Sequence, residues 1–281
     1  MRSAAILVAT LIGQDVTADT PRFQPVDVPP HVYDGGWEHF VGGGLAVLDC
    51  DGDQRPDLVA AGGSNPMQLL RNTSVDGGAI HFEPAPSQAL NLTGTTGAYP
   101  LDIDNDGILD LVVLRVGPDT VLRGRGDCTF EAMPFTFADH WTTAFSATWE
   151  GGQTAPTLAF GHYVDRHDPD GPFEACDVNH LWRPDGATYT VTDLAPGHCA
   201  LSILFTDWAR TGRADLRVSN DRHYYVRDGQ EQLWAMEDKP RLFPKKTAGR
   251  ATCFGAWGSR PAIWIATGGT RCFSVPWAIN A

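Results

Sequence analysis

The sequence predicts an all-β protein built from repeated units of four short strands, and three observations lead to this prediction. Glycine and proline account for 30 and 20 of the 281 residues, which suits short strands joined by tight turns. A pattern of alternating aspartates followed by an apolar run recurs along the chain. A second pattern, an apolar pair followed by arginine and turn residues, recurs between copies of the first.

The composition excludes several classes of protein. The chain has 21 basic and 34 acidic side chains, and its net charge of −13 argues against nucleic acid or an anionic membrane as the main partner. Apolar residues make up 42% of the sequence, which excludes a disordered acidic tail. The sequence has no apolar run long enough to span a bilayer.

The first 18 residues predict an export signal. Arg2 precedes the apolar residues 4–12, and the small residues 16–18 offer a cleavage site ahead of Asp19. A short buried strand or helix is the alternative. Residues 19–281 would then form a single domain. Six cysteines without a C-x-x-C pair favour an oxidising compartment, so we expect a secreted, periplasmic or cell-surface protein.

The acidic pattern sets the length of the repeat. D-x-D-x-D-x-x-x-D begins at Asp49 and again at Asp102. A partial copy begins at Asp207, and copies without the acidic residues begin at Trp149 and Phe254. The spacing of 47 to 58 residues is typical of the blades of a β-propeller.

The second pattern predicts a hairpin in each unit. It begins at Gln68, Val121, His180 and Tyr224, and in each case a strand leads into turn residues. Each unit is therefore expected to run inner strand, acidic loop, second strand, connection, third strand, turn and outer strand. This is a four-stranded blade.

The two ends of the chain predict how the ring closes. Residues 23–28 resemble an outer strand that has no blade before it. The last unit offers strands near 252–257, 262–267 and 271–275 but no outer strand. Joining these ends would give a closed propeller of five blades without exposed sheet edges.

The sequence resembles the FG-GAP/VCBS repeat propellers, and most of all the cartilage-acidic-protein (CRTAC-like) group with its integrin-α-type calcium loops. The resemblance rests on residues 37–49, 163–165 and 218–221, spans residues 23–275 and is strongest in the first two units. It implies a secreted, calcium-stabilised propeller. Nothing in the sequence resembles the ASPIC/UnbV domain that members of this group often carry.

The aspartate-rich loops are predicted to bind Ca²⁺, which takes about six to eight oxygen ligands. Carboxylates at loop positions 1, 3, 5 and 9, with the backbone carbonyl at position 7, would wrap one ion in each loop. The expected ligands are Asp49, Asp51, Asp53, Asp57 and the carbonyl of Arg55 in the first loop, and Asp102, Asp104, Asp106, Asp110 and the carbonyl of Ile108 in the second. We expect these ions to be structural.

Variations among the loops qualify this prediction. Gly107 at position 6 permits a sharp bend, whereas Gln54 at the same position predicts a looser first loop. The loop that begins at Asp207 lacks acidic residues at positions 3 and 5 and predicts no metal. The alternative for both acidic loops is a set of solvated surface carboxylates, with Arg55 as a competing partner.

The blade arrangement also suggests how the cysteines pair, although six cysteines can pair in many ways. The suggested pairs are Cys176–Cys199 and Cys253–Cys272 on one face of the propeller, which leaves Cys50–Cys128 on the opposite face.

The longest connection, residues 161–180, is the predicted contact surface, because loops of one face commonly carry the function of a rigid scaffold. The candidate ligand-face residues are His162, Tyr163, Asp165, His167, Asp168 and Asp170. The three aspartates among them could hold another cation. An ordinary polar loop held by Cys176 is the alternative.

Binding is favoured over catalysis. The chain contains neither H-E-x-x-H nor G-x-S-x-G, and its histidines are scattered along the sequence. We expect a monomeric binding or adhesion module for an extracellular protein or glycan. The alternatives are a structural envelope protein and a carbohydrate-active lyase or hydrolase. A carboxyl pair with a raised pKa in a deep cleft would favour the enzyme.

Overall fold

The computed structural model describes residues 23–169, 175–221 and 230–244, and it confirms an all-β chain. These residues form sixteen β-strands and two single-turn 3-10 helices, η1 (Trp37–His39) and η2 (Gln88–Leu90). In the described part of the chain, neither helix approaches the length and apolarity needed to cross a membrane.

The strands form three antiparallel sheets of four, eight and four strands. They fall into four successive units of four strands each, and the second and third units are joined into the eight-stranded sheet by the pairing of residues 116–118 with 139–141. The first contains β1 (Leu45–Leu48), β2 (Asp57–Ala60), β3 (Gln68–Asn72) and β4 (Phe82–Pro84). The second contains β5 (Thr95–Leu101), β6 (Asp110–Pro118), β7 (Thr120–Gly124) and β8 (Phe130–Ala132). The third contains β9 (Asp139–Thr148), β10 (Thr157–His162), β11 (Asn179–Asp185) and β12 (Thr188–Leu194). The fourth contains β13 (Ala200–Thr206), β14 (Asp215–Asn220), β15 (Gln232–Ala235) and β16 (Arg241–Leu242).

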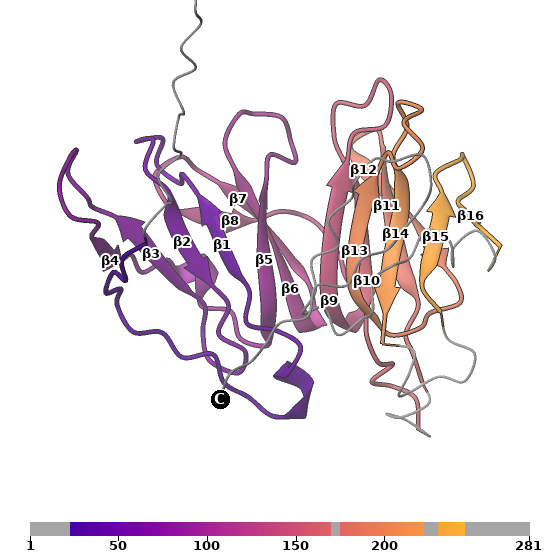
Figure 1. Ribbon diagram of the computed structural model, residues 1–281, viewed down its shortest axis with the longest axis horizontal. Coiled ribbons are helices and arrows are strands. Elements are labelled where there is room, and N and C mark those ends of the chain that lie inside the picture. The colour runs from indigo at the N-terminus through magenta and orange to yellow at the C-terminus, as the bar shows by residue number, and fades with distance from the viewer. Residues whose placement is uncertain (1–22, 170–174, 222–229, 245–281) are drawn as a thin grey trace, which may run out of the picture.

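The four units follow one another across the molecule, from indigo β1–β4 to orange and yellow β13–β16 (Figure 1). Three apolar clusters lie between successive units, and each draws its residues from the two sheets that flank it. The second strands are apolar on both faces because they are covered from both sides. Leu111, Val112, Val113 and Leu114 of β6, for example, are all at most 1% exposed.

The first strands of neighbouring units contact one another. The backbone N–H of Gly44 donates to the carbonyl of Thr96 at 3.2 Å, and the Thr96 hydroxyl donates to the carbonyl of Thr142 at 2.6 Å. The hydroxyl of Thr143 donates to the carbonyl of Ala200 at 2.6 Å. This row of first strands, with the sheets stacked outward from it, is consistent with the blades of a β-propeller.

One detail of the predicted blades differs in the structure, and two others lie outside the described residues. Residues 23–28 form no strand, and Phe23 is 94% exposed, so they lack the outer-strand role expected of them. The strands expected at 252–257, 262–267 and 271–275 lie outside the described residues, and the described sheets do not close a ring. The hairpin pattern predicted from Tyr224 to residue 229 also lies outside the described residues, and the described third strand of the fourth unit is β15, whose buried Leu233 and Trp234 pair with β14.

The structure contains two disulfides among the described residues, Cys50–Cys128 and Cys176–Cys199, and these are two of the suggested pairs. The first joins the acidic loop of unit one to the β7–β8 turn of unit two across 78 residues. The second spans 23 residues and holds the long connection after β10 to the start of β13. The suggested pair Cys253–Cys272 lies outside the described residues.

The sizes of these loops predict different contributions to stability. A disulfide that closes a longer loop restricts the unfolded chain more, so Cys50→Ser/Cys128→Ser should lower the free energy of unfolding by about 4 kcal/mol and Cys176→Ser/Cys199→Ser by about 3 kcal/mol. Guanidinium denaturation of both double variants in Ca²⁺-containing buffer measures this. A Cys50/Cys128 variant as stable as the native protein would contradict the expectation.

Candidate functional site

The three loops that carry aspartates at positions 1 and 9 have the same backbone conformation. Each has a positive φ at positions 4 and 6: Gly52 (75°) and Gln54 (65°), Asn105 (60°) and Gly107 (85°), Arg210 (55°) and Gly212 (80°). The looser first loop expected from Gln54 is therefore wrong. Gln54 takes the left-handed conformation that favours glycine because its N–H donates to Asp49 Oδ2 at 2.8 Å.

The aspartate at position 1 organises each of these turns. Asp102 accepts hydrogen bonds from the backbone N–H groups of Asp106 at 3.2 Å and Gly107 at 3.0 Å. Asp49 and Asp207 accept bonds from the amides at the same two positions of their own loops. The loop that lacks the middle carboxylates therefore keeps the hydrogen bonds of position 1.

The aspartate at position 9 is buried and connects the loop to the third strand. Asp110 is fully buried; its Oδ2 accepts the N–H of Ile103 at 2.9 Å, and its Oδ1 accepts the N–H of Gly124 at 3.0 Å. Asp57 makes the equivalent bonds with Cys50 and Asn72. Burial raises the pKa of both carboxyls, the backbone bonds lower it, and the other carboxylates of each loop raise it.

An arginine on the third strand reaches back into each of the first three loops. Arg71 forms an ion pair with Asp51, and Arg123 pairs with Asp104 at 2.6 Å. In unit three the arginine at the same register is Arg183, which pairs with Glu150 at 3.0 Å. Unit four has Ala235 at this register. These ion pairs were missed at the sequence level, although the repeated arginine of the hairpin pattern was their signal.

The acidic loops gather carboxylate oxygens in units one and two. Asp49, Asp51 and Asp53 offer oxygens that lie within 4.8 Å of one another, and so do Asp102, Asp104 and Asp110. The predicted ligands Asp57 and Asp106 lie outside these two groups. Arg55, expected to contribute its carbonyl, also bonds Asp53 through its guanidinium at 3.0 Å. The donor sets consist only of hard oxygens and keep net negative charge after the arginines are counted, so they fit Ca²⁺.

The fourth loop is built without such a group. Ala209 and Thr211 stand at positions 3 and 5, and the indole N–H of Trp208 donates to Asp215 Oδ2 at 3.1 Å. The N–H of Met236 donates to Asp215 Oδ1 at 3.3 Å, and the guanidinium of Arg213 lies 3.7 Å from the same oxygen.

The long connection after β10 lies at the opposite end of its sheet from the loop at Glu150. Asp165, His167 and Asp168 line a cavity of about 280 Å³ together with Trp37 and Arg166. Of the other candidate ligand-face residues, His162 and Tyr163 are buried, and Asp170 lies outside the described residues. The hydroxyl of Tyr163 donates to Asp221 Oδ2 at 2.6 Å, so this side chain belongs to the core.

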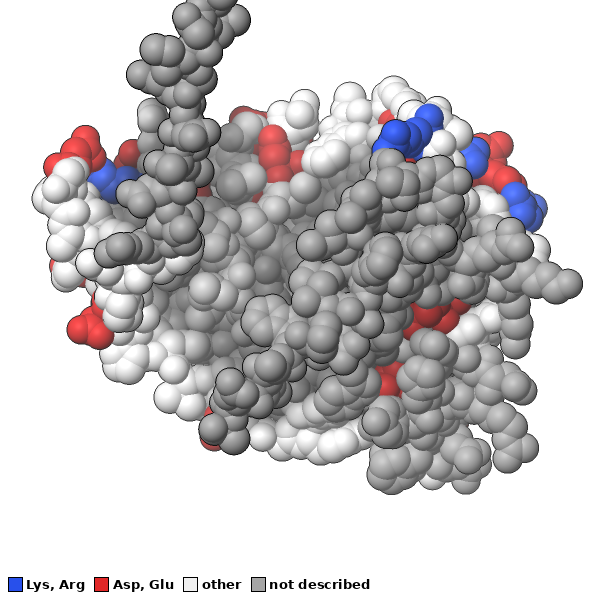
Figure 2. Space-filling view, in the orientation of Figure 1, with Lys and Arg blue, Asp and Glu red and all other residues white. Residues whose placement is uncertain are grey.

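Ion pairs hold the acidic groups around this cavity. Arg166 donates from Nε to Glu38 at 2.8 Å and from a terminal nitrogen to Asp139. Figure 2 shows that acidic side chains on the face in view are scattered, and that several of them lie beside basic ones.

Residues 49–113 match the family described as FG-GAP-like repeat. The match begins at the first residue of the first acidic loop and ends in β6, so it contains both aspartate-rich loops. A comparison with curated proteins finds no match. The repeat and the four antiparallel units are consistent with a β-propeller.

The buried aspartates at position 9 should stabilise the fold without any metal. Asparagine offers one acceptor oxygen where Asp110 and Asp215 each accept two hydrogen bonds, so Asp110→Asn and Asp215→Asn should each lower the free energy of unfolding by about 1–3 kcal/mol. Denaturation in the presence of a chelator measures this. The exposed Asp76→Asn is the control, and a loss seen only in Ca²⁺ would contradict the prediction.

Proposed function

We propose that this chain is an extracellular five-bladed β-propeller that binds two Ca²⁺ ions and serves as a binding module for a protein or glycan. The observation that carries the proposal is the repetition of one loop design in units one and two. The same backbone turn, the same buried aspartate and the same arginine surround a group of converging carboxylates in both.

The calcium sites would use the residues of each loop. Asp49, Asp51 and Asp53 would hold the first ion, with Asp57 and the carbonyl of Arg55 as further ligands. Asp102, Asp104 and Asp110 would hold the second, with Asp106 and the carbonyl of Ile108. The ion would neutralise carboxylates that otherwise repel one another, and its binding energy would add to the stability of the fold.

The opposite end of the blades would carry the contact surface. The cavity there combines the indole of Trp37 with carboxylates and a guanidinium, groups that pack against and hydrogen-bond a sugar or peptide. Its carboxylates Glu38 and Asp139 are engaged by Arg166. Ionised carboxylates held in this way favour recognition over the proton transfer that a glycoside hydrolase requires.

The calcium assignment predicts two separable sites. The chelator-treated full chain should bind two Ca²⁺ ions with dissociation constants of about 10⁻⁴–10⁻³ M in calorimetric titration. Asp51→Asn/Asp53→Asn should remove one site and Asp104→Asn/Asp106→Asn the other, whereas Asp207→Asn should remove neither. No heat of binding up to several times that concentration would refute both sites.

The contact-surface assignment predicts that Trp37 carries recognition. A screen of glycan and protein arrays with fluorescent full-length protein in Ca²⁺ should identify a bound class, and Trp37→Ala should weaken its binding by about tenfold or more. Trp149→Ala, which removes another half-exposed tryptophan, should leave binding unchanged. Binding that survives Trp37→Ala with unaltered affinity would place the contact surface elsewhere.

A further inference from the structure

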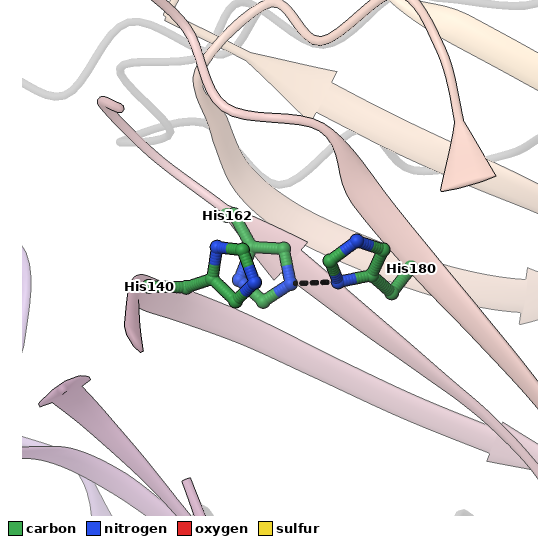
Figure 3. A group of neighbouring side chains, drawn as sticks. All are labelled: His140, His162 and His180. Atoms are coloured by element: carbon green, nitrogen blue, oxygen red, sulfur yellow. Dashed lines mark hydrogen bonds between the residues drawn. The ribbon is translucent and has the colours of Figure 1, made fainter. Parts of the chain in front are cut away.

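Three histidines from adjacent strands of unit three meet at the end of the sheet that lies opposite its β9–β10 loop. His140 comes from β9, His162 from β10 and His180 from β11 (Figure 3). Each offers a ring nitrogen, and these nitrogens all lie within 4.8 Å of one another. Figure 3 shows the rings of His140 and His162 lying against each other, with His180 joined to His162 by a hydrogen bond.

The second nitrogen of each ring already has a polar partner. His140 Nδ1 donates to Asp177 Oδ2 at 2.6 Å, and His180 Nε2 lies 3.5 Å from Asp193 Oδ1. The Thr142 hydroxyl donates to buried Asp119 at 2.8 Å, so its oxygen is free to accept from His162 Nδ1 at 3.0 Å. These contacts leave Nε2 of His140, Nε2 of His162 and Nδ1 of His180 as the nitrogens that face one another.

This arrangement supplies both the ligands of a metal site and the polar groups that orient those ligands. Ligating histidines usually donate their other ring N–H to a carboxylate, carbonyl or water, which fixes the tautomer and strengthens the ligand. The nearby carboxylates of Asp177, Asp193 and Asp119 would balance the charge of a divalent ion.

The spacing suits a tetrahedral ion. Zn–N bonds of about 2.0–2.1 Å place neighbouring ligand nitrogens roughly 3.3 Å apart. His162 Nε2 and His180 Nδ1 are 2.9 Å apart, and a ring nitrogen of His140 lies within 4.8 Å of both. Imidazole nitrogens suit Zn²⁺ and do not suit Ca²⁺, which takes oxygen ligands.

The histidines also line a cavity of about 250 Å³, together with Phe137, Phe160 and Trp182. An ion held by the three histidines would keep its fourth coordination position open toward this largely apolar cavity. Water or a small ligand could complete the coordination there.

We propose that His140, His162 and His180 form a binding site for Zn²⁺ with one open coordination position. The site is separate from the acidic loops, and the proposal of Zn²⁺ binding does not depend on the proposed calcium binding.

The test uses tag-free full-length protein with its disulfides intact, stripped by a chelator and returned to buffer with excess Ca²⁺. Titration should show one Zn²⁺ bound per chain, and Co²⁺ in place of Zn²⁺ should give the intense visible absorption of a four-coordinate nitrogen site. His162→Gln and His180→Gln should each weaken Zn²⁺ binding by more than about tenfold and abolish the Co²⁺ band. Asp177→Asn should weaken binding about 10- to 100-fold through its effect on His140.

Two controls keep the outcome decisive. His167→Gln changes a nearby exposed histidine outside the cluster and should leave Zn²⁺ and Co²⁺ binding unchanged. Asp104→Asn should leave them unchanged as well, since it alters only an acidic loop. Failure of the native protein to bind Zn²⁺, or a Co²⁺ spectrum of six-coordinate oxygen ligands, would overturn the proposal. So would equal binding by a folded His162→Gln variant, with folding judged by circular dichroism.

Discussion

The buried aspartate at position 9 is the constraint that connects loop and strands in units one, two and four. A carboxylate removed from water requires hydrogen bonds, and Asp57, Asp110 and Asp215 each obtain two from fixed donors. One donor belongs to the turn between the first and second strands, and the other to the end of the third strand. In these three units, one side chain therefore ties the turn of the loop to the end of the third strand.

In units one, two and four, the residue at position 3 of the loop and the residue of the third strand that faces the loop vary together. Where position 3 is an aspartate, the third strand carries an arginine that reaches it, as in Arg71–Asp51 and Arg123–Asp104. Where position 3 is Ala209, the third strand carries Ala235 instead. Of the described loops between first and second strands, only the first two keep more carboxylates than arginines. A divalent cation would neutralise this excess of negative charge.

The units place different chemistry at their two ends. Hard carboxylate oxygens gather at the turns between first and second strands. In unit three the opposite end carries imidazoles, aromatic rings and the disulfide Cys176–Cys199. Because antiparallel strands alternate in direction, every first-to-second turn lies at one end of its sheet, so a sequence feature of that turn is repeated on one face. The other end carries connections of different length and composition, which is where specific sites arise.

The amino-acid sequence alone determined the all-β class, the order of strands in the first three units and the position of the acidic loops, because these follow from local rules: turn residues, alternating aspartates and short apolar runs. The tertiary structure decided the rest. The histidine cluster depends on the register of three consecutive strands, and the ion pairs of Arg71 and Arg123 depend on a third strand folding back over its own loop. Residues 23–28 have the composition of a strand, but a strand also needs a neighbour to bond with, and no local pattern can supply that neighbour.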